Sequence, residues 1–315
     1  MVRWLPRPRL DRAFYKAHGL GNDYLVFEEG DDWDASPENV RAVCDRFSGV
    51  GSDGIVVLAD PGQPRRSQVS VELRMFNPDG GEFERSGNGL RILGSYLARS
   101  IEGLRNIDVR VGGEEVHMIV HGRAGAVHDL SVEMGIARTG PPAVDLNVGA
   151  ISRTDGMRIF LPGPARESLE IVPVSIGNPH LVVVGVDGKS TGMTEFQLAR
   201  LGPFLAGHAA LENGANVQLA VPDGLSECRA LIWERGVGRT AASGTSACAV
   251  AVAMVSSGQL SPCEIAVAMP GGSLSVTVSS DLDVVLRGPV EEVCEGQIST
   301  RRLAEMTRCA GQDCA

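Results

Sequence analysis

Aromatic side chains and positive charge are both scarce in this chain of 315 residues. It contains 8 Phe, 3 Tyr and 3 Trp, and its 29 Lys and Arg are outnumbered by 39 Asp and Glu, which gives a net charge of −10. Proteins that bind nucleic acid use clustered Lys and Arg to contact phosphates and aromatic rings to stack on bases. The composition therefore argues against a nucleic-acid partner.

Long apolar segments are also missing. The longest apolar run, residues 247–255, has nine residues, about half of the ~20 that a helix needs to cross a bilayer. The first residues carry several arginines but no apolar stretch, so they do not form a secretory signal. We therefore expect a cytoplasmic protein with no membrane partner.

The seven cysteines form neither a Cys-x-x-Cys pair nor a zinc-binding pattern. We expect them to be reduced thiols, as is usual in the cytoplasm. His117 and His121 fall on one face of a predicted strand. Without a carboxylate or thiol partner they are not expected to bind a metal, so the sequence predicts no metal site.

Two short motifs each occur twice, at almost the same separation. The segment Gly-Asn-Asp-Tyr-Leu-Val at 21–26 resembles Gly-Asn-Pro-His-Leu-Val at 177–182, with 156 positions between Asn22 and Asn178. Ser-Gly-Asn-Gly at 86–89 and Ser-Gly-Thr-Ser at 243–246 are separated by 157 positions. We interpret the chain as two similar halves. Each half has a Gly-Asn turn that leads into a strand and a Ser-Gly turn that leads into a helix.

Strands outnumber helices in the predicted secondary structure, which indicates a mixed α/β (α+β) protein. Alternating and β-branched runs predict the strands, and apolar periodicity predicts the helices. The predicted strands are 25–27, 54–58, 69–75, 116–120, 171–176, 181–184, 217–221, 229–233, 265–269 and 274–278. The predicted helices are 37–47, 88–99, 194–206 and 244–257. No Gly-x-Gly-x-x-Gly follows a strand, which disfavours a dinucleotide-binding fold.

The segment Thr-Gly-Pro-Pro at 139–142 interrupts regular structure and marks the boundary between the halves. We predict an N-terminal half at 1–138, a C-terminal half at 139–284 and a tail at 301–315.

The two Ser-Gly turns each begin a predicted helix. Serine is a favoured N-cap, so one interpretation is that Ser86 and Ser243 only cap their helices. A helix N-terminus is also a binding site for a carboxylate, and Gly87 and Gly244 leave room for one to approach. Because the two turns are at matched positions of a repeat, we favour a site that holds one anion between two helix N-termini.

Asparagines are unusually dense around these turns. Each one alone is more often a turn residue, but as a group they are typical of a site for a small zwitterion, with amides on the ammonium and helix termini on the carboxylate. The asparagines concerned are Asn22, Asn77, Asn88, Asn178 and Asn216.

These motifs together resemble the diaminopimelate epimerase family of cofactor-independent amino-acid isomerases. The matching stretches run in the family's order from residue 14 to beyond residue 250 and cover most of the chain. They are 18–24 (HGLGNDY), 51–54 (GSDG), 75–80 (MFNPDG), 86–91 (SGNGLR), 177–180 (GNPH), 216–217 (NV), 234–238 (ERGVG) and 243–245 (SGT).

The resemblance implies two pseudo-symmetric domains, each a mostly antiparallel sheet or barrel wrapped around a central helix, with residues near 285–300 completing the first. It also implies a substrate in the cleft between the domains, no cofactor and a homodimer. The substrate-binding residues that it implies are Asn22, Asn77, Gly87, Asn88, Asn178, Asn216, Glu234, Arg235, Gly244 and Thr245.

The chain departs from the family at the residues that matter most. In the family the two key residues are cysteines, one at each of these turns, and one thiolate removes the α-proton while the other thiol reprotonates the opposite face. Here those positions are Ser86 and Ser243. A thiol has a pKa of ~8.5, whereas a serine hydroxyl is a far weaker acid and needs a neighbouring base. One hypothesis is that His180 and Glu234, which the resemblance places beside the first and second turns, form the principal acid/base pair with pKa values near the working pH.

Two neighbouring positions also depart from the family pattern, Arg239 in place of an acidic residue and Ser246 in place of glycine. These changes favour natural divergence over an engineered pair of Cys-to-Ser substitutions. Cys248 lies about 140° around the helix from the second turn and is expected to face the core.

The leading interpretation is an isomerase that inverts the α-carbon of an amino acid, converting LL- to meso-diaminopimelate or acting on a related substrate. One alternative keeps the fold and the site but catalyses a lyase, dehydratase or other isomerisation reaction on a small amino or carboxylic acid. Another is a protein that binds its ligand without catalysis.

Overall fold

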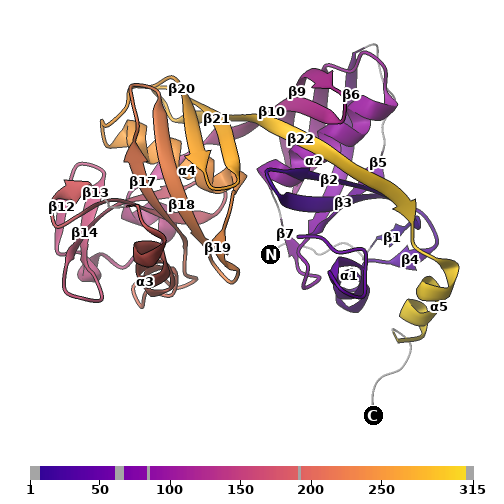
Figure 1. Cartoon of the computed structure of the whole chain (residues 1–315), viewed down its shortest axis with the longest axis horizontal. Helices are drawn as coiled ribbons and strands as arrows, with labels where there is room; N and C mark the ends of the chain where they lie inside the picture. The colour runs from indigo at the N-terminus through magenta and orange to yellow at the C-terminus, as the bar shows by residue number, and fades with distance from the viewer. Residues whose placement is uncertain (1–7, 61–66, 84–85, 191–192, 310–315) are drawn as a thin grey trace. The chain divides into compact units, whose positions relative to one another are not determined.

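The chain divides into two units in the computed structural model, which describes residues 8–60, 67–83, 86–190 and 193–309. Unit 1 comprises Met1–Val132 and Pro289–Ala315, and unit 2 comprises Glu133–Gly288. The chain passes from one unit to the other within strand β10 (Val127–Ile136) and returns within strand β22 (Asp283–Gln297) (Figure 1). The N-terminal unit is therefore completed by the end of the chain.

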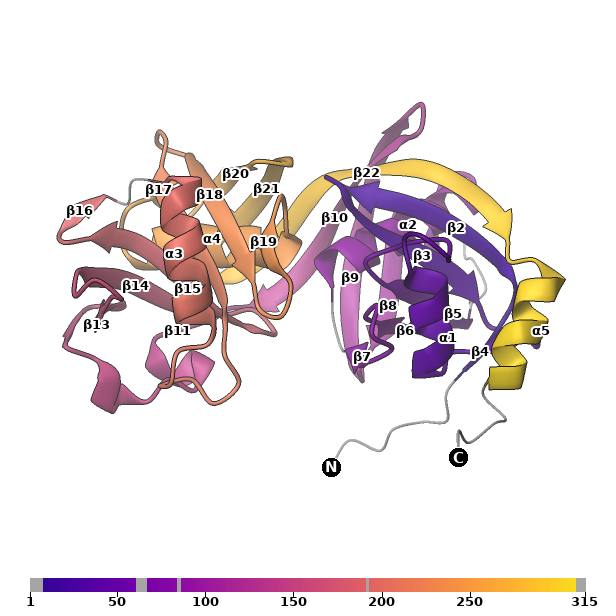
Figure 2. The same cartoon turned by 60° about the horizontal axis from the view of Figure 1, so that its bottom comes forward.

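Unit 1 is a barrel of strands closed around helix α2 (Gly87–Ser100), as Figure 2 shows. Its strands are β2 (Ala13–Gly19), β3 (Asn22–Glu28), β5 (Ile55–Asp60), β6 (Gln68–Phe76), β8 (Asn106–Val111), β9 (Glu114–Ala124) and β10. They pair in this order, in parallel between β3 and β5 and between β6 and β8, and antiparallel elsewhere, and β22 pairs with the free edge of β2. Helix α2 packs against β2, β3, β5 and β9.

Unit 2 repeats this topology. Its strands are β14 (Ser168–Ser175), β15 (Pro179–Val186), β17 (Asn216–Pro222), β18 (Glu227–Glu234), β20 (Glu264–Met269), β21 (Gly272–Val278) and β22. The parallel pairs again fall second and fourth, between β15 and β17 and between β18 and β20. Strand β11 (Arg138–Thr139) pairs with β14 as β22 does with β2, and helix α4 (Gly244–Ser256) packs inside. Two units with one pairing order confirm the pseudo-symmetric fold.

Shorter elements complete the two units. In unit 1 they are β1 (Arg9–Leu10), β4 (Trp33–Asp34), α1 (Pro37–Cys44), β7 (Glu82–Phe83) and α5 (Thr300–Cys309). In unit 2 they are β12 (Arg153–Asp155), β13 (Arg158–Pro162), β16 (Lys189–Ser190), α3 (Glu195–Ala206), β19 (Gly238–Thr240) and the 3-10 turns Pro141–Val144 and Val148–Ala150. No helix in the described ranges is long and apolar enough to cross a membrane.

The two central helices are held by close apolar packing. In α4 every residue from Ala247 to Met254 is fully buried, including Cys248, which faces the core as expected. In α2 a Cβ at Gly94 would lie only 2.5 Å from Leu130 Cδ2, so the helix lies directly on the strand beneath it. Burial of one large apolar side chain contributes about 1.5–3 kcal/mol. The N-terminus of each helix is therefore fixed relative to its barrel.

The predicted strands and helices are present, with two differences. Helix α1 ends at Cys44 and does not continue to residue 47, because the Asp45 carboxylate accepts hydrogen bonds from the backbone of Phe47 and Ser48 and closes a turn. The segment predicted as a tail contains α5, which packs against α1 and β4 and buries Leu303 and Met306. This helix is amphipathic and contributes to the core of unit 1.

Candidate active site

Both serines of the Ser-Gly turns are helix N-caps. Ser86 Oγ accepts a hydrogen bond from Gly89 N at 3.1 Å, and Ser243 Oγ accepts one from Ser246 N at 3.5 Å. This confirms the capping interpretation. A cap satisfies only one of the four N–H groups that an α-helix leaves without an internal partner at its start. Capping therefore does not exclude binding of an anion at either helix.

In unit 1 the Gly-Asn turn is the hairpin turn between β2 and β3. Leu20 and Gly21 have φ values of +54° and +88°, the left-handed pair that a tight two-residue hairpin requires. Asn22, the first residue of β3, accepts a hydrogen bond from Asn88 Nδ2 of helix α2 at its Oδ1 (2.8 Å) and at its backbone carbonyl (2.6 Å). The turn and the start of α2 therefore lie at the same end of the barrel.

The side-chain amide of Asn88 forms all of its hydrogen bonds with other residues of the protein. Both hydrogens of its amide go to Asn22, and its Oδ1 accepts a bond from Arg91 Nη2 at 3.0 Å. Its side chain is buried. These contacts give Asn88 a role in fixing Asn22 and leave no amide hydrogen for a substrate.

Substitution of Gly19 with alanine is expected to disrupt this pair. A Cβ at Gly19 would lie 2.0 Å from Asn88 Oδ1, so the Asn88 amide would have to move away from Asn22. We expect a loss of about 1–3 kcal/mol in the free energy of unfolding, measured by urea denaturation. Gly122→Ala, at an exposed position of β9 with no atom within 4 Å of its Cβ and no positive φ, is the control for loss of a glycine alone. An equal loss in both variants would contradict the steric explanation.

In unit 2 a buried chain of hydrogen bonds begins at the second Gly-Asn turn. His180 Nε2 lies 2.8 Å from Asn178 Oδ1, and its Nδ1 lies 3.0 Å from Gln218 Nε2. The same Gln218 amide donates to Ser246 Oγ at 3.0 Å, in the first turn of α4. The imidazole therefore accepts at Nδ1 and donates from Nε2, and it links the turn to the start of the central helix.

Burial lowers the pKa of His180 to about 3, and the positive charge of Arg235 acts in the same direction. The imidazole has no exposed surface. It is neutral at neutral pH, and both of its nitrogens are occupied by other side chains. The hypothesis of a His180 acid/base group required a pKa near the working pH, and this environment moves the pKa far below it.

Strands β15, β17 and β18 bring three further candidate residues to the same end of unit 2. His180 is opposite Asn216 in the parallel pair of β15 and β17. Asn216 Oδ1 accepts a bond from the backbone N–H of Arg235 at 2.9 Å, just after β18. Glu234 Oε2 lies 3.4 Å from the hydroxyl of Thr240. Asn216 thus holds the chain that carries Glu234 and Arg235.

Comparison with known proteins identifies the family. The family model described as diaminopimelate epimerase matches residues 14–139 and 172–293. Diaminopimelate epimerase 2 of a Nostoc species is 33% identical over 293 residues, which cover 92% of this chain and 97% of that protein. The diaminopimelate epimerase of Magnetococcus marinus is 32% identical over 291 residues, covering 92% and 98%. The chain belongs to the diaminopimelate epimerase family. Membership makes it an isomerase of the epimerase type.

Among solved structures, a hydroxyproline epimerase from Agrobacterium vitis superposes with a TM-score of 0.59 over 94% of each chain, at 14% identity. This likeness supports the fold alone. All the candidate site residues lie within the two ranges that match the diaminopimelate epimerase family.

The remaining candidate residues are Asn77, Gly87, Gly244 and Thr245. Asn77 is exposed just after β6, where its backbone closes a turn with Gly81. Gly87 and Gly244 are the buried first residues of α2 and α4, and Thr245 follows in α4. Residues 84 and 85, which precede the first Ser-Gly turn, lie outside the described ranges.

One expectation about the histidines is wrong. His117 does have a carboxylate partner, because β8 pairs with β9 and brings Asp108 Oδ1 to 2.8 Å from its Nδ1. The pair lowers the pKa of Asp108. Within the described ranges no group of three or more His, Cys, Asp or Glu side chains is arranged to hold a metal ion.

Sequence reasoning missed Gln218 as part of the site. It is a fully buried polar residue within the apolar strand β17 (Asn-Val-Gln-Leu-Ala-Val-Pro). Buried polar side chains are retained in cores where they have hydrogen-bond partners. A glutamine inside an apolar strand beside an asparagine of the site was therefore a usable signal. Ser246 was noted only as a departure from the family. In the structure its hydroxyl accepts the last hydrogen bond of the buried series, from Gln218 Nε2.

Proposed function

We propose that this protein inverts the α-carbon of diaminopimelate or of a closely related amino acid, without a cofactor. The observation that carries the proposal is the repetition in each unit of a serine-capped central helix beside a Gly-Asn turn. Two similar half-sites suit a reaction in which a proton leaves one face of a carbon and returns to the other. The names of the two relatives described above support diaminopimelate as the substrate.

In this proposal the N-termini of α2 and α4 bind the α-carboxylate, and Ser86 and Ser243 occupy the two acid/base positions. The residues that bind the substrate, directly or through a neighbouring side chain, are Asn22, Asn77, Gly87, Asn88, Asn178, Asn216, Glu234, Arg235, Gly244 and Thr245. In Asn22, Asn178 and Asn216 the side-chain amide oxygen accepts a hydrogen bond from another group of the protein. The amide nitrogen of each side chain therefore points away from that donor. Amides held in this way suit carboxylate oxygens better than an ammonium group. Asn88 acts through Asn22, and Glu234 is the remaining acidic group for the substrate's ammonium or for a proton.

A specific observation favours a second candidate, a protein that binds the amino acid without turnover. Both serine hydroxyls are engaged as caps, and the pKa of His180 lies far below neutrality. Neither half-site then offers a strong base at neutral pH among these groups. Loss of the reaction with retention of binding follows from this arrangement.

We propose a homodimer in the cytoplasm, supported by the resemblance of the motifs to the diaminopimelate epimerase family. Sedimentation of the full-length protein tests the dimer, since a monomer mass near 33.3 kDa would contradict it.

The proposed reaction is tested by proton NMR of the protein with LL- and meso-diaminopimelate in D₂O. We expect slow loss of the α-proton signal and appearance of the other stereoisomer. Saturable binding without exchange would establish the second candidate instead. A new vinyl signal or loss of a substituent would point to a lyase or dehydratase. Neither binding nor exchange with any stereoisomer would overturn both candidates.

A further inference from the structure

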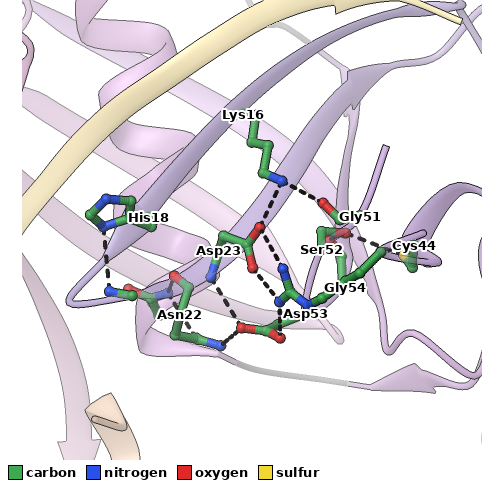
Figure 3. Close-up of polar contacts among 12 residues, drawn as sticks. Lys16, His18, Asn22, Asp23, Cys44, Gly51, Ser52, Asp53 and Gly54 are labelled. Carbon is green, nitrogen blue, oxygen red and sulfur yellow. Dashed lines mark hydrogen bonds and ion pairs between the residues drawn. The ribbon is translucent and has the colours of Figure 1, made fainter. Parts of the chain in front are cut away.

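The segment Gly51–Gly54 matches the family motif but has no role in the reaction proposed above. It precedes β5, and Figure 3 shows that it lies against the Gly-Asn turn of unit 1. Asp53 N donates to the Asp23 carbonyl at 2.9 Å, and Asp53 Oδ2 accepts from Asp23 N at 3.2 Å. The motif is therefore joined to the start of β3 through both backbone and side chain.

Asp53 also binds the Asn22 amide. Asn22 Nδ2 donates to Asp53 Oδ2 at 2.7 Å (Figure 3). Asn22 Oδ1 accepts from Asn88 Nδ2 at 2.8 Å. A carboxylate can only accept, and Asn88 presents only a donor, so the amide fits in one direction. Rotation by 180° would place the Asn22 oxygen against the Asp53 carboxylate. One Asn22 N–H is used by Asp53, and the second is left to point away from it.

Asp53 is itself held by a charged network. Arg46 Nη2 contacts Asp53 Oδ1 at 2.6 Å and Asp23 Oδ1 at 2.7 Å, which bridges the two carboxylates. Lys16 Nζ contacts Asp23 Oδ2 at 3.0 Å and the carbonyl of Gly51 at 2.6 Å. The network has two positive and two negative charges. Through Lys16 it also contacts Gly51, the first residue of the Gly51–Gly54 segment.

Asp23 is the buried centre of this network. Its burial opposes ionisation, but the hydrogen bonds and ion pairs from Arg46 and Lys16 outweigh that cost and lower its pKa. The side chain of Asp53 is 38% exposed and that of Arg46 is 51% exposed. The outer part of the network can therefore be altered with less risk to the core than Asp23 itself.

We propose that Asp53, held by Arg46, is a positioning residue that fixes the direction of the Asn22 amide for substrate binding. The inference rests on the proposed function for its substrate and deepens it by assigning a role to residues outside the site. Asp53 acts through Asn22 and does not itself touch the substrate. Preorganised polar groups lower the cost of ordering the site when the substrate binds.

The test is a double-mutant cycle on kcat/KM for diaminopimelate, with Asp53→Asn, Asn22→Ala and the double variant. Because a hydrogen bond to a charged group is stronger than one between neutral groups, we expect Asp53→Asn to lower kcat/KM about 10-fold or more, mainly through KM. If Asp53 acts through Asn22, it has little further effect in the Asn22→Ala background. Equal fold-losses in both backgrounds would overturn the proposal.

Two further variants serve as controls for the double-mutant cycle. Asp31→Asn makes the same change of charge at a fully exposed residue of unit 1 and should match the wild type. Arg46→Lys keeps the positive charge but has a shorter side chain and lacks the planar guanidinium that contacts both carboxylates here. We expect a smaller loss of about 3-fold that also vanishes in the Asn22→Ala background. If Asp53→Asn does not fold, Arg46→Lys replaces it in the double-mutant cycle with Asn22→Ala.

A readout independent of catalysis separates this proposal from the proposed function. The side-chain amide signals of Asn22 in the ¹⁵N-labelled full-length protein are assigned by their loss in Asn22→Ala. In Asp53→Asn, the N–H that faces Asp53 should move toward the position of ordinary exposed amides. An unchanged signal overturns the positioning role even if the protein is active. A shifted signal in a protein that does not bind or convert diaminopimelate supports the positioning role while the proposed substrate fails.

Discussion

Replacing Ser86 and Ser243 together with cysteine is expected to raise the rate of diaminopimelate epimerisation by about 10²–10⁴-fold. This is the range that a correctly placed general acid/base contributes to catalysis. Both hydroxyls already lie at the N-terminus of a buried central helix, where they accept hydrogen bonds from the helix backbone. The substitution changes the acidity of the group and leaves its position on the helix unchanged.

The physical reason is the difference in proton affinity between a thiol and a hydroxyl. A free thiol has a pKa of ~8.5, and the partial positive charge of a helix N-terminus lowers it. A thiolate is then available near neutral pH, whereas a serine needs a base to take its proton. In unit 2 the imidazole of His180 is neutral but has a pKa of about 3, which makes it a weak proton acceptor.

The single variants separate the two faces of the reaction. With one thiol, we expect exchange of the α-proton of one stereoisomer for deuterium without inversion. With both, exchange is accompanied by inversion. The measurement is proton NMR in D₂O with each stereoisomer in turn, and the double variant should be the one that reaches equilibrium between stereoisomers.

The stability of the cysteine variants and a matched control variant show whether the gain in rate comes from the two helix N-termini. Loss of a serine N-cap costs about 0.5–2 kcal/mol, so each cysteine variant should be slightly less stable than the wild type while being more active. Ser256→Cys adds a thiol to the last turn of α4, far along the helix from Ser243, and should leave the rate unchanged. No gain in the double variant, or an equal gain in the control, would contradict the assignment of these two positions.

Much of the fold follows from patterns visible in the sequence. The repeated motifs predicted two similar halves, and the two units share one order of strand pairing. The run of apolar residues after Ser243 predicted a fully buried helix, because a helix that is apolar on all sides has no face for solvent. Gly258, with a φ of +73°, ends that region as expected.

The electrostatics of the site could not be predicted in the same way. The pKa of His180 depends on complete burial and on Gln218, which lies on the neighbouring strand 38 positions away. The direction of the Asn22 amide depends on Asp53 and Asn88, which come from a loop and a helix. Sequence spacing shows which residues are near a turn, but it does not show which atom of an amide faces which partner.

The stability of the protein should fall on acidification because of His180. In the unfolded chain a histidine has a pKa near 6.5, whereas burial holds the folded pKa at about 3. Between these values the unfolded chain binds a proton that the folded protein does not. The contribution of the neutral imidazole is therefore fully present above about pH 6.5 and is lost as the pH falls, by up to about 1.4 kcal/mol per pH unit.

His180→Gln removes this group and should flatten the pH dependence. At pH 8 we expect the variant to be less stable than the wild type by about 1–3 kcal/mol, because the hydrogen bonds to Asn178 and Gln218 are disturbed in a buried site. The difference should shrink between pH 6 and pH 4.5, since only the wild type loses the contribution of His180. Urea unfolding at several pH values measures both effects, and His128, whose pKa burial also lowers, is common to the two proteins. Parallel curves would show that His180 titrates near its ordinary pKa in the folded protein, and they would return it to the acid/base role that its burial now argues against.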